Sequence, residues 1–137
     1  MKALLVVASA SILFLAACGG SAGTASSGTV NATLTDSKIV LDKAVVSSGK
    51  ITFNVKNAGT TVHELVVLKT DLAQDKILAN PDEPGKMSED GSLGEIADLN
   101  VGETKPFTLD LEPGNYVLMY NETGHYLLGM HIAFVVK

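Results

Sequence analysis

Two histidines and a methionine carry side chains that can bind a metal ion of soft or borderline character. His63 follows the turn sequence Asn57-Ala58-Gly59 and opens an apolar run, while His125 and Met130 share one short loop near the C-terminus. Imidazole nitrogen and thioether sulfur suit copper better than calcium or magnesium, which prefer oxygen ligands. A histidine at the start of a strand also fits a purely structural role. The predicted site therefore depends on a fold that brings these two segments together.

The elements that position these residues are predicted to be β-strands. Apolar and polar residues alternate with a period of two over residues 30–34, 51–55 and 107–111, which is typical of half-buried strands. Residues 63–68, 116–120 and 132–136 are more continuously apolar, and Gly, Pro, Asn and Ser residues punctuate the chain between the strands. The pattern predicts an all-β domain, an antiparallel Greek-key β-sandwich. His63, His125 and Met130 each lie at a strand boundary, so we expect them at one end of it.

Residues 71–93 depart from this pattern. The segment is polar and contains Pro81, Pro84, Gly85 and Gly91. We expect a long connection with one helical turn around residues 72–78. Connections of this length serve either as functional covers or as surface loops.

Three motifs resemble those of a known family. Residues 53–64 match F-x-V-x-N-x-G-x-x-x-H-E, residues 113–118 match P-G-x-Y-x-L, and residues 121–130 match N-x-x-G-H-Y-x-x-G-M. In these motifs the chain resembles a bacterial cupredoxin, the plastocyanin and azurin type of copper domain, from about residue 29 to residue 137. The resemblance implies the Greek-key fold, copper as cofactor, and His63, His125 and Met130 as ligands.

The chain departs from the family at one ligand position, where Tyr120 replaces the copper-binding cysteine. Blue copper sites combine two histidines and a cysteine with a weak axial methionine. A phenol has a pKa near ~10 and must lose its proton to bind a metal well, so Tyr120 is only a candidate ligand. We therefore predict a site for Cu(I) and/or Cu(II) that is not a classical type 1 site. Its predicted role is to hold or deliver copper rather than to transfer electrons as a blue copper protein.

Two other functions remain open. In the first, the domain is a metal-free cupredoxin-fold binding module in which Tyr120 fills the volume of the copper and its thiolate. In the second, it is an atypical copper electron carrier with an unusual ligand set. An enzyme is not expected, because the motif region has no Ser or Cys nucleophile beside a base and no close carboxylate pair.

Cys18 is the only cysteine in the sequence and predicts where the protein resides. Residues 1–17 have the basic start and short apolar run of a secretory signal peptide. Leu15-Ala16-Ala17-Cys18 resembles the lipobox of bacterial lipoproteins, in which the cysteine is lipidated. Residues 18–28 are rich in Gly and Ser and form a predicted flexible tether of roughly 15–20 Å. We therefore expect an extracytoplasmic domain, residues 29–137, lipid-anchored to a bacterial membrane and facing either the periplasm or the outer surface.

The charge balance excludes one class of partner. The sequence contains 10 basic residues, all of them lysine, against 15 Asp and Glu, for a net charge of −5. An acidic chain without arginine is a poor match for phosphate backbones, so nucleic acid is not expected as a partner. The expected partners are the membrane, through the lipid anchor, and a periplasmic copper or redox protein.

Overall fold

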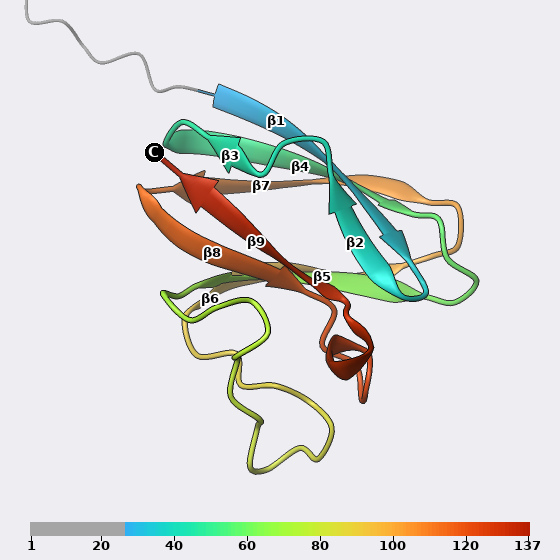
Figure 1. The fold of residues 1–137 in the computed structure, drawn as a ribbon. Coiled ribbons are helices and arrows are strands. Elements are labelled where there is room, and N and C mark those ends of the chain that lie inside the picture. Colours follow the sequence, from blue (N-terminus) through green and yellow to red (C-terminus); the bar gives the residue numbers. More distant parts are fainter. Residues whose placement is uncertain (1–26) are drawn as a thin grey trace, which may run out of the picture.

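The computed structural model describes residues 27–137, which form two β-sheets packed face to face (Figure 1). The predicted signal peptide, Cys18 and the tether up to residue 26 lie outside the described residues. The strands of the first sheet, in spatial order, are β2 (Lys38–Leu41), β1 (Ser27–Thr35), β4 (Gly49–Asn57) and β7 (Thr104–Leu111). Those of the second sheet are β3 (Val45–Val46), β9 (His131–Val136), β8 (Gly114–Met119), β5 (His63–Lys69) and β6 (Ser92–Leu99). A short 3-10 helix, η1 (Tyr126–Leu128), lies between β8 and β9.

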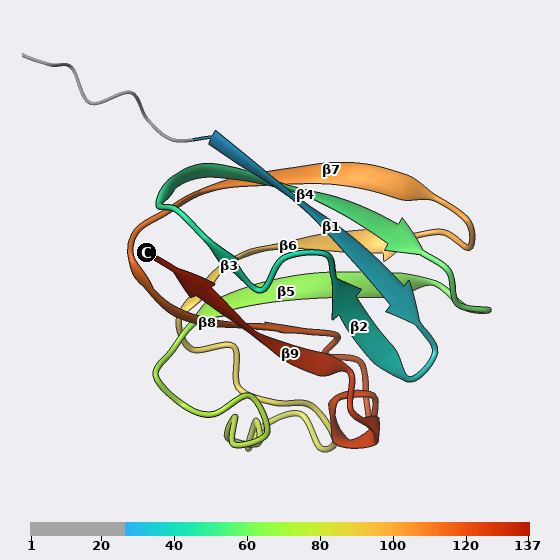
Figure 2. The same cartoon turned by 45° about the horizontal axis from the view of Figure 1, so that its top comes forward.

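The predicted all-β sandwich is confirmed, but its two sheets are mixed. Most neighbouring strands are antiparallel, whereas β1 pairs with β4 and β3 pairs with β9 in the parallel sense. The chain leaves the first sheet after β2, passes through β3 in the second sheet, and returns as β4 (Figure 2). A crossover of this kind is what allows two strands of one sheet to run parallel.

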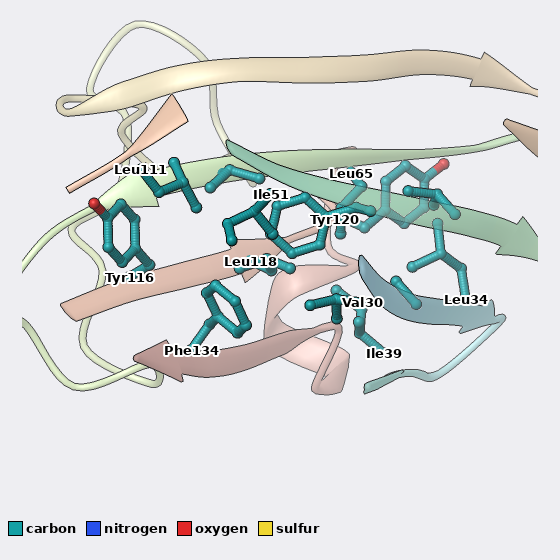
Figure 3. Close-up of a cluster of buried hydrophobic side chains, with 14 of the residues drawn as sticks. Val30, Leu34, Ile39, Ile51, Leu65, Leu111, Tyr116, Leu118, Tyr120 and Phe134 are labelled. Carbon is teal, nitrogen blue, oxygen red and sulfur yellow. The ribbon is translucent and has the colours of Figure 1, made fainter. Parts of the chain in front are cut away.

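The main core lies between the two sheets (Figure 3). In β4 the residues Ile51, Phe53 and Val55 are buried while their neighbours are more exposed, as the alternation predicts. The Phe53 ring meets that of Phe134 from β9 edge to face, with 5.4 Å between ring centroids. Tyr120 lies at the opposite end of this core from Tyr116 (Figure 3).

The second sheet is also covered on its outer face, by residues 70–91, which connect β5 to β6 and which we call the strap (Figure 1). A second hydrophobic cluster joins the strap to the sheet and comprises Val66, Leu68, Ile77, Met87, Val117, Met119 and Tyr126. This cover explains why β5 and β8 are apolar on both faces rather than alternating.

The predicted helical turn at residues 72–78 is wrong. The segment forms an isolated turn closed by the Lys76 N–H, which donates to the Ala73 carbonyl at 2.8 Å. The next amide, Ile77 N–H, donates to the Tyr126 hydroxyl at 3.0 Å instead of continuing a helix. A tertiary contact has replaced the local hydrogen bond. Within residues 27–137, no helix is long and apolar enough to cross a membrane.

Candidate metal site

The fold brings His63, Tyr120, His125 and Met130 to one end of the sandwich. His63 opens β5, Tyr120 follows β8, His125 immediately precedes η1, and Met130 immediately precedes β9. The Tyr120 ring centroid lies 4.8 Å from that of His63 and 4.6 Å from that of His125. The two imidazole centroids are 6.4 Å apart. Met130 is fully buried in the same core cluster as Tyr120.

Backbone hydrogen bonds hold the loop that carries three of these residues. The Tyr120 N–H donates to the Met130 carbonyl at 3.0 Å, and the Met130 N–H donates to the His125 carbonyl at 3.2 Å. Gly129 ends η1 with a φ of 102°, a left-handed conformation that glycine adopts without steric cost. The Gly129 N–H donates to the Tyr126 carbonyl at 2.9 Å and closes the turn.

Asn57 positions His63 from the end of β4. Its side-chain amide donates to the carbonyls of Thr61 and Leu99 at 2.7 and 2.8 Å, and its carbonyl accepts from the Gly59 N–H at 2.9 Å. The His63 side chain uses Nδ1 to donate to the Thr61 carbonyl at 2.9 Å. In the neutral tautomer with this hydrogen bond, Nε2 is the nitrogen that has a free lone pair.

Two imidazole nitrogens in this cluster are buried without a hydrogen-bond partner among the described residues, His63 Nε2 and His125 Nδ1. Native structures rarely leave buried polar atoms unpaired, because each costs about 1–3 kcal/mol. A metal ion would satisfy both nitrogens. Met130, whose backbone is bonded to Tyr120 and His125, would add its buried thioether as a soft ligand. Within residues 27–137, no three side chains from His, Cys, Asp and Glu are grouped to hold a metal ion. A three-ligand site built from the predicted residues therefore needs Met130.

Tyr120 reaches the cluster as predicted, but its oxygen has another partner. The hydroxyl donates to the Val62 carbonyl at 3.1 Å. Burial, aided by the charges of Glu122 and Glu64, raises the pKa of Tyr120 above its ordinary value. Coordination through the phenolate would break this hydrogen bond and remove a proton that the site retains. The ring packs against both imidazoles, and its role as a ligand stays a prediction.

Asp36 borders the same cluster, although the sequence analysis did not single it out. It lies in the turn between β1 and β2, where Oδ1 accepts from the Thr60 N–H at 2.7 Å and Oδ2 from the Thr60 hydroxyl at 2.9 Å. These bonds lower the pKa of Asp36, with smaller contributions from the nearby His63 and His125. Asp36 Oδ1 is 3.9 Å from His63 Nε2. The pairing of β1 with β4 brings the turn that carries Asp36 close to His63. Because this contact joins segments that are distant in sequence, no local sequence pattern predicts that Asp36 borders the cluster.

Asn121 ties the ligand loop to the strap and was also missed. Its side-chain carbonyl accepts from the Met87 N–H at 2.7 Å, and its amide donates to the Met87 carbonyl at 3.0 Å and to Glu89 at 2.8 Å. The Asn121 N–H donates to Glu64 at 3.1 Å. The strap thus fixes the start of the loop that carries His125. An asparagine following a strand resembles any turn residue, and its partners are remote in sequence.

His131, the third histidine, directly follows Met130 but packs on Tyr126 rather than on the other two imidazoles. It is half-buried, and its ring packs on that of Tyr126 with 4.6 Å between centroids. Its Nδ1 is buried without a partner among the described residues. Burial lowers the pKa of His131, and the charge of Asp75 opposes this effect.

Comparison with known proteins supports the architecture. No protein-family model matches the sequence, and no curated protein matches it. Among solved structures, dithionite-reduced auracyanin from the photosynthetic bacterium Roseiflexus castenholzii is 23% identical, with 82% of this chain and 98% of that chain covered and a TM-score of 0.59. Auracyanin A from Chloroflexus aurantiacus, described as a "blue" copper protein, is 22% identical, with 82% and 100% covered and a TM-score of 0.54.

Rusticyanin from Thiobacillus ferrooxidans is 15% identical, with 80% of this chain and 77% of that chain covered and a TM-score of 0.59. These neighbours are cupredoxins. The fold of the described residues is therefore cupredoxin-like, as the sequence motifs predict.

Proposed function

We propose that this protein is a membrane-anchored, extracytoplasmic copper-binding protein that holds or delivers copper through His63, His125 and Met130. The observation that carries the proposal is the pair of buried imidazole nitrogens, one on each histidine, that have no partner among the described residues. Rings whose centroids are 6.4 Å apart would need to approach one another by only roughly 1 Å to share a tetrahedral ion, because metal–nitrogen bonds are about 2 Å long. The cupredoxin-like fold adds support, since auracyanin A is described as a copper protein.

The ligand chemistry favours storage or transfer of copper over blue-copper electron transfer. Copper bound here would lack a thiolate, because Tyr120 stands in the cysteine position of the family motif. Two imidazoles and a thioether suit Cu(I), which accepts few ligands and soft donors. Cys18, the only cysteine in the sequence, is the proposed lipid attachment site and does not restore the thiolate.

The anchor and the partner belong to the same proposal. A lipid on Cys18, followed by a Gly/Ser tether, would hold the domain close to the membrane surface. From there the domain would receive copper from, or pass it to, an extracytoplasmic partner protein.

A metal-free binding module is the second candidate, and the packing of Tyr120 favours it. Its ring contacts both imidazoles, and its hydroxyl is already satisfied by Val62. In that case the exposed Leu127 and Leu128 of η1 would form the working surface. An atypical electron carrier is the third candidate. It needs a copper couple that changes oxidation state without large rearrangement of its ligands, and replacing the thiolate with a phenol works against that.

A copper titration separates these candidates. The protein for this test is the mature chain from residue 18 with Cys18→Ser, so that no thiol remains to bind copper. We expect one equivalent of Cu(I), measured by competition with a chromophoric chelator, and a Cu(II) form without intense blue absorption. His63→Ala and His125→Ala should each weaken binding by more than about 100-fold, beyond the ~10–100-fold typical of residues that only orient ligands.

His131→Ala is the matched control, since it removes a third imidazole outside the cluster. It should leave the copper affinity unchanged. If the unaltered site binds neither oxidation state stoichiometrically, the metal-free module is the correct function.

A further inference from the structure

We infer that Asp36 is an additional ligand of this site, one that favours divalent copper over monovalent copper. The inference rests on the proposed function and deepens it, since it assigns the oxidation-state preference to a residue outside the cupredoxin motifs. Asp36 comes from the turn between β1 and β2 in the first sheet, whereas the other proposed ligands belong to the second sheet or its loops.

The geometry places a carboxylate oxygen beside an unpaired ligand nitrogen. Asp36 Oδ1 lies 3.9 Å from His63 Nε2, which is buried and has no hydrogen-bond partner among the described residues. Two ligands bonded at about 2 Å to one tetrahedral ion lie ~3.3 Å apart. Asp36 Oδ1 therefore needs to approach His63 Nε2 by about half an ångström. In the described residues Asp36, His63 and His125 are not grouped closely enough to hold an ion, so binding requires this movement.

Asp36 is held in place but retains capacity to bind a cation. Each of its oxygens accepts one hydrogen bond from Thr60, through the backbone N–H and the hydroxyl. A carboxylate offers about four lone-pair positions, so Oδ1 keeps one that can face an ion. Thr60 thus fixes the carboxylate beside His63 without using up its acceptor capacity.

Gly59 makes this approach sterically feasible. A Cβ at residue 59 would lie 2.4 Å from Asp36 Oδ1 and 2.6 Å from His63 Cε1, so a side chain there would force the carboxylate or the imidazole to shift. The glycine is needed here for close approach rather than for an unusual backbone conformation. The turn after β4 therefore accommodates the carboxylate and the imidazole next to each other.

The chemistry of the Asp36 carboxylate favours Cu(II) over Cu(I). An anionic oxygen ligand suits Cu(II) or Zn(II), whereas soft Cu(I) gains little from it. The negative charge also attracts a divalent ion more strongly than a monovalent one at the same distance. Asp36 supplies part of the anionic character that a cysteine thiolate would provide in a blue copper site.

The test is Asp36→Asn in the mature Cys18→Ser chain. Asparagine keeps the shape of the side chain and an oxygen that can accept from Thr60, but it removes the charge and the anionic ligand. We expect the affinity for Cu(II) to fall about tenfold or more and the affinity for Cu(I) to change less than about threefold. The Cu(II) electron paramagnetic resonance parameters should shift, because an oxygen ligand is lost.

Asp42→Asn is a closely matched control. Asp42 also follows a strand of the first sheet, accepts hydrogen bonds from a backbone N–H and a side chain, both of Asn31, and has a lowered pKa. Its replacement removes the same charge away from the histidine cluster and should change neither affinity nor spectrum. Thermal unfolding of the metal-free variants shows whether Asp36→Asn acts through the fold.

The outcomes are distinct. Unchanged Cu(II) affinity and spectrum in Asp36→Asn, or equal loss of Cu(I) and Cu(II) affinity, would overturn the role of Asp36 while leaving the copper site intact. A parent chain that binds no copper would overturn both this inference and the proposed function.

Discussion

In the proposed copper site, Tyr120 would determine which copper chemistry is accessible. Tyr120 follows β8, at the position where the cupredoxin motifs that the sequence resembles have their cysteine, and its ring contacts both imidazoles. In Tyr120→Cys, a thiolate would reach the same cluster and complete a set of two histidines, a cysteine and a methionine. We expect a blue or green Cu(II) protein with an intense charge-transfer band in its visible spectrum.

Tyr120→Cys removes a large buried ring and should destabilise the metal-free protein by about 3 kcal/mol or more. Copper binding should restore part of that loss by linkage. Tyr120→Phe is the control, since it keeps the ring and loses only the bond to Val62. A folded, copper-loaded Tyr120→Cys without the band would show that residue 120 does not face the metal.

His131 gives the fold a dependence on pH that is separate from the metal site. Its pKa is lowered mainly by burial, so the folded state binds fewer protons than the unfolded state below the ordinary value of 6.5. The contribution of His131 to the free energy of unfolding is therefore fully present above pH 6.5 and is lost as the pH falls through the folded-state pKa.

His131→Phe keeps a ring against Tyr126 and should show a smaller loss of stability on acidification. Denaturant titrations of the metal-free proteins at about pH 8 and about pH 5, on either side of the ordinary pKa of histidine, measure the difference. Equal losses in both proteins would contradict this account.

At the level of elements, the strap contributes to the core as well as covering the sheet. Met87 is 4% exposed and packs in the second hydrophobic cluster. The Asn121 side chain accepts a hydrogen bond from the Met87 N–H and donates one to the Met87 carbonyl. Met87→Ala should lower the free energy of unfolding by about 2–5 kcal/mol, because it leaves a cavity in that cluster. Leu78→Ala is the control in the same strap. Leu78 is 68% exposed, so its loss should change stability by no more than about 0.5 kcal/mol. Chemical denaturation would contradict the packing role if the two variants were equally stable.

The sequence predicts the strands that carry a strong hydrophobic pattern and misses those that do not. Alternation in β4 and β7 and apolar runs in β5, β8 and β9 indicate their positions correctly. In contrast, β2 and β3 were not predicted and have only four and two residues, and β6 is an unpredicted edge strand whose side chains are mostly exposed. Their pairing depends on neighbouring strands rather than on their own residues, which is why local pattern reasoning cannot detect them.

The same limit applies to the site. The motifs around His63 and His125 predict that these residues and Met130 converge, and the structure places His63 and His125 at one end of the sandwich with Met130 at the start of β9. Asp36, Asn121 and the strap could not be predicted, because their contacts join segments that are far apart in sequence. Tertiary geometry is needed to find residues that act from a different sheet or loop.

At the level of the whole molecule, the proposed lipid on Cys18 would determine where the protein resides. Cys18→Ser should abolish lipid attachment and release the domain from the membrane, because the lipid on Cys18 is the proposed anchor. Membrane fractionation and mass spectrometry of the N-terminal peptide would measure both effects. A Cys18→Ser protein that remains membrane-bound after a high-salt wash would refute the lipoprotein assignment.

In the proposed site, one copper ion binds between His63 and His125. Crystals of the mature Cys18→Ser chain, loaded with copper and measured at the copper absorption edge, would locate the ion in the anomalous difference map. We expect a single strong peak about 2 Å from a ring nitrogen of each histidine. The peak should disappear in His63→Ala and persist in His131→Ala. An absent peak, or a peak located away from both imidazoles, would show that these histidines do not share a copper ion.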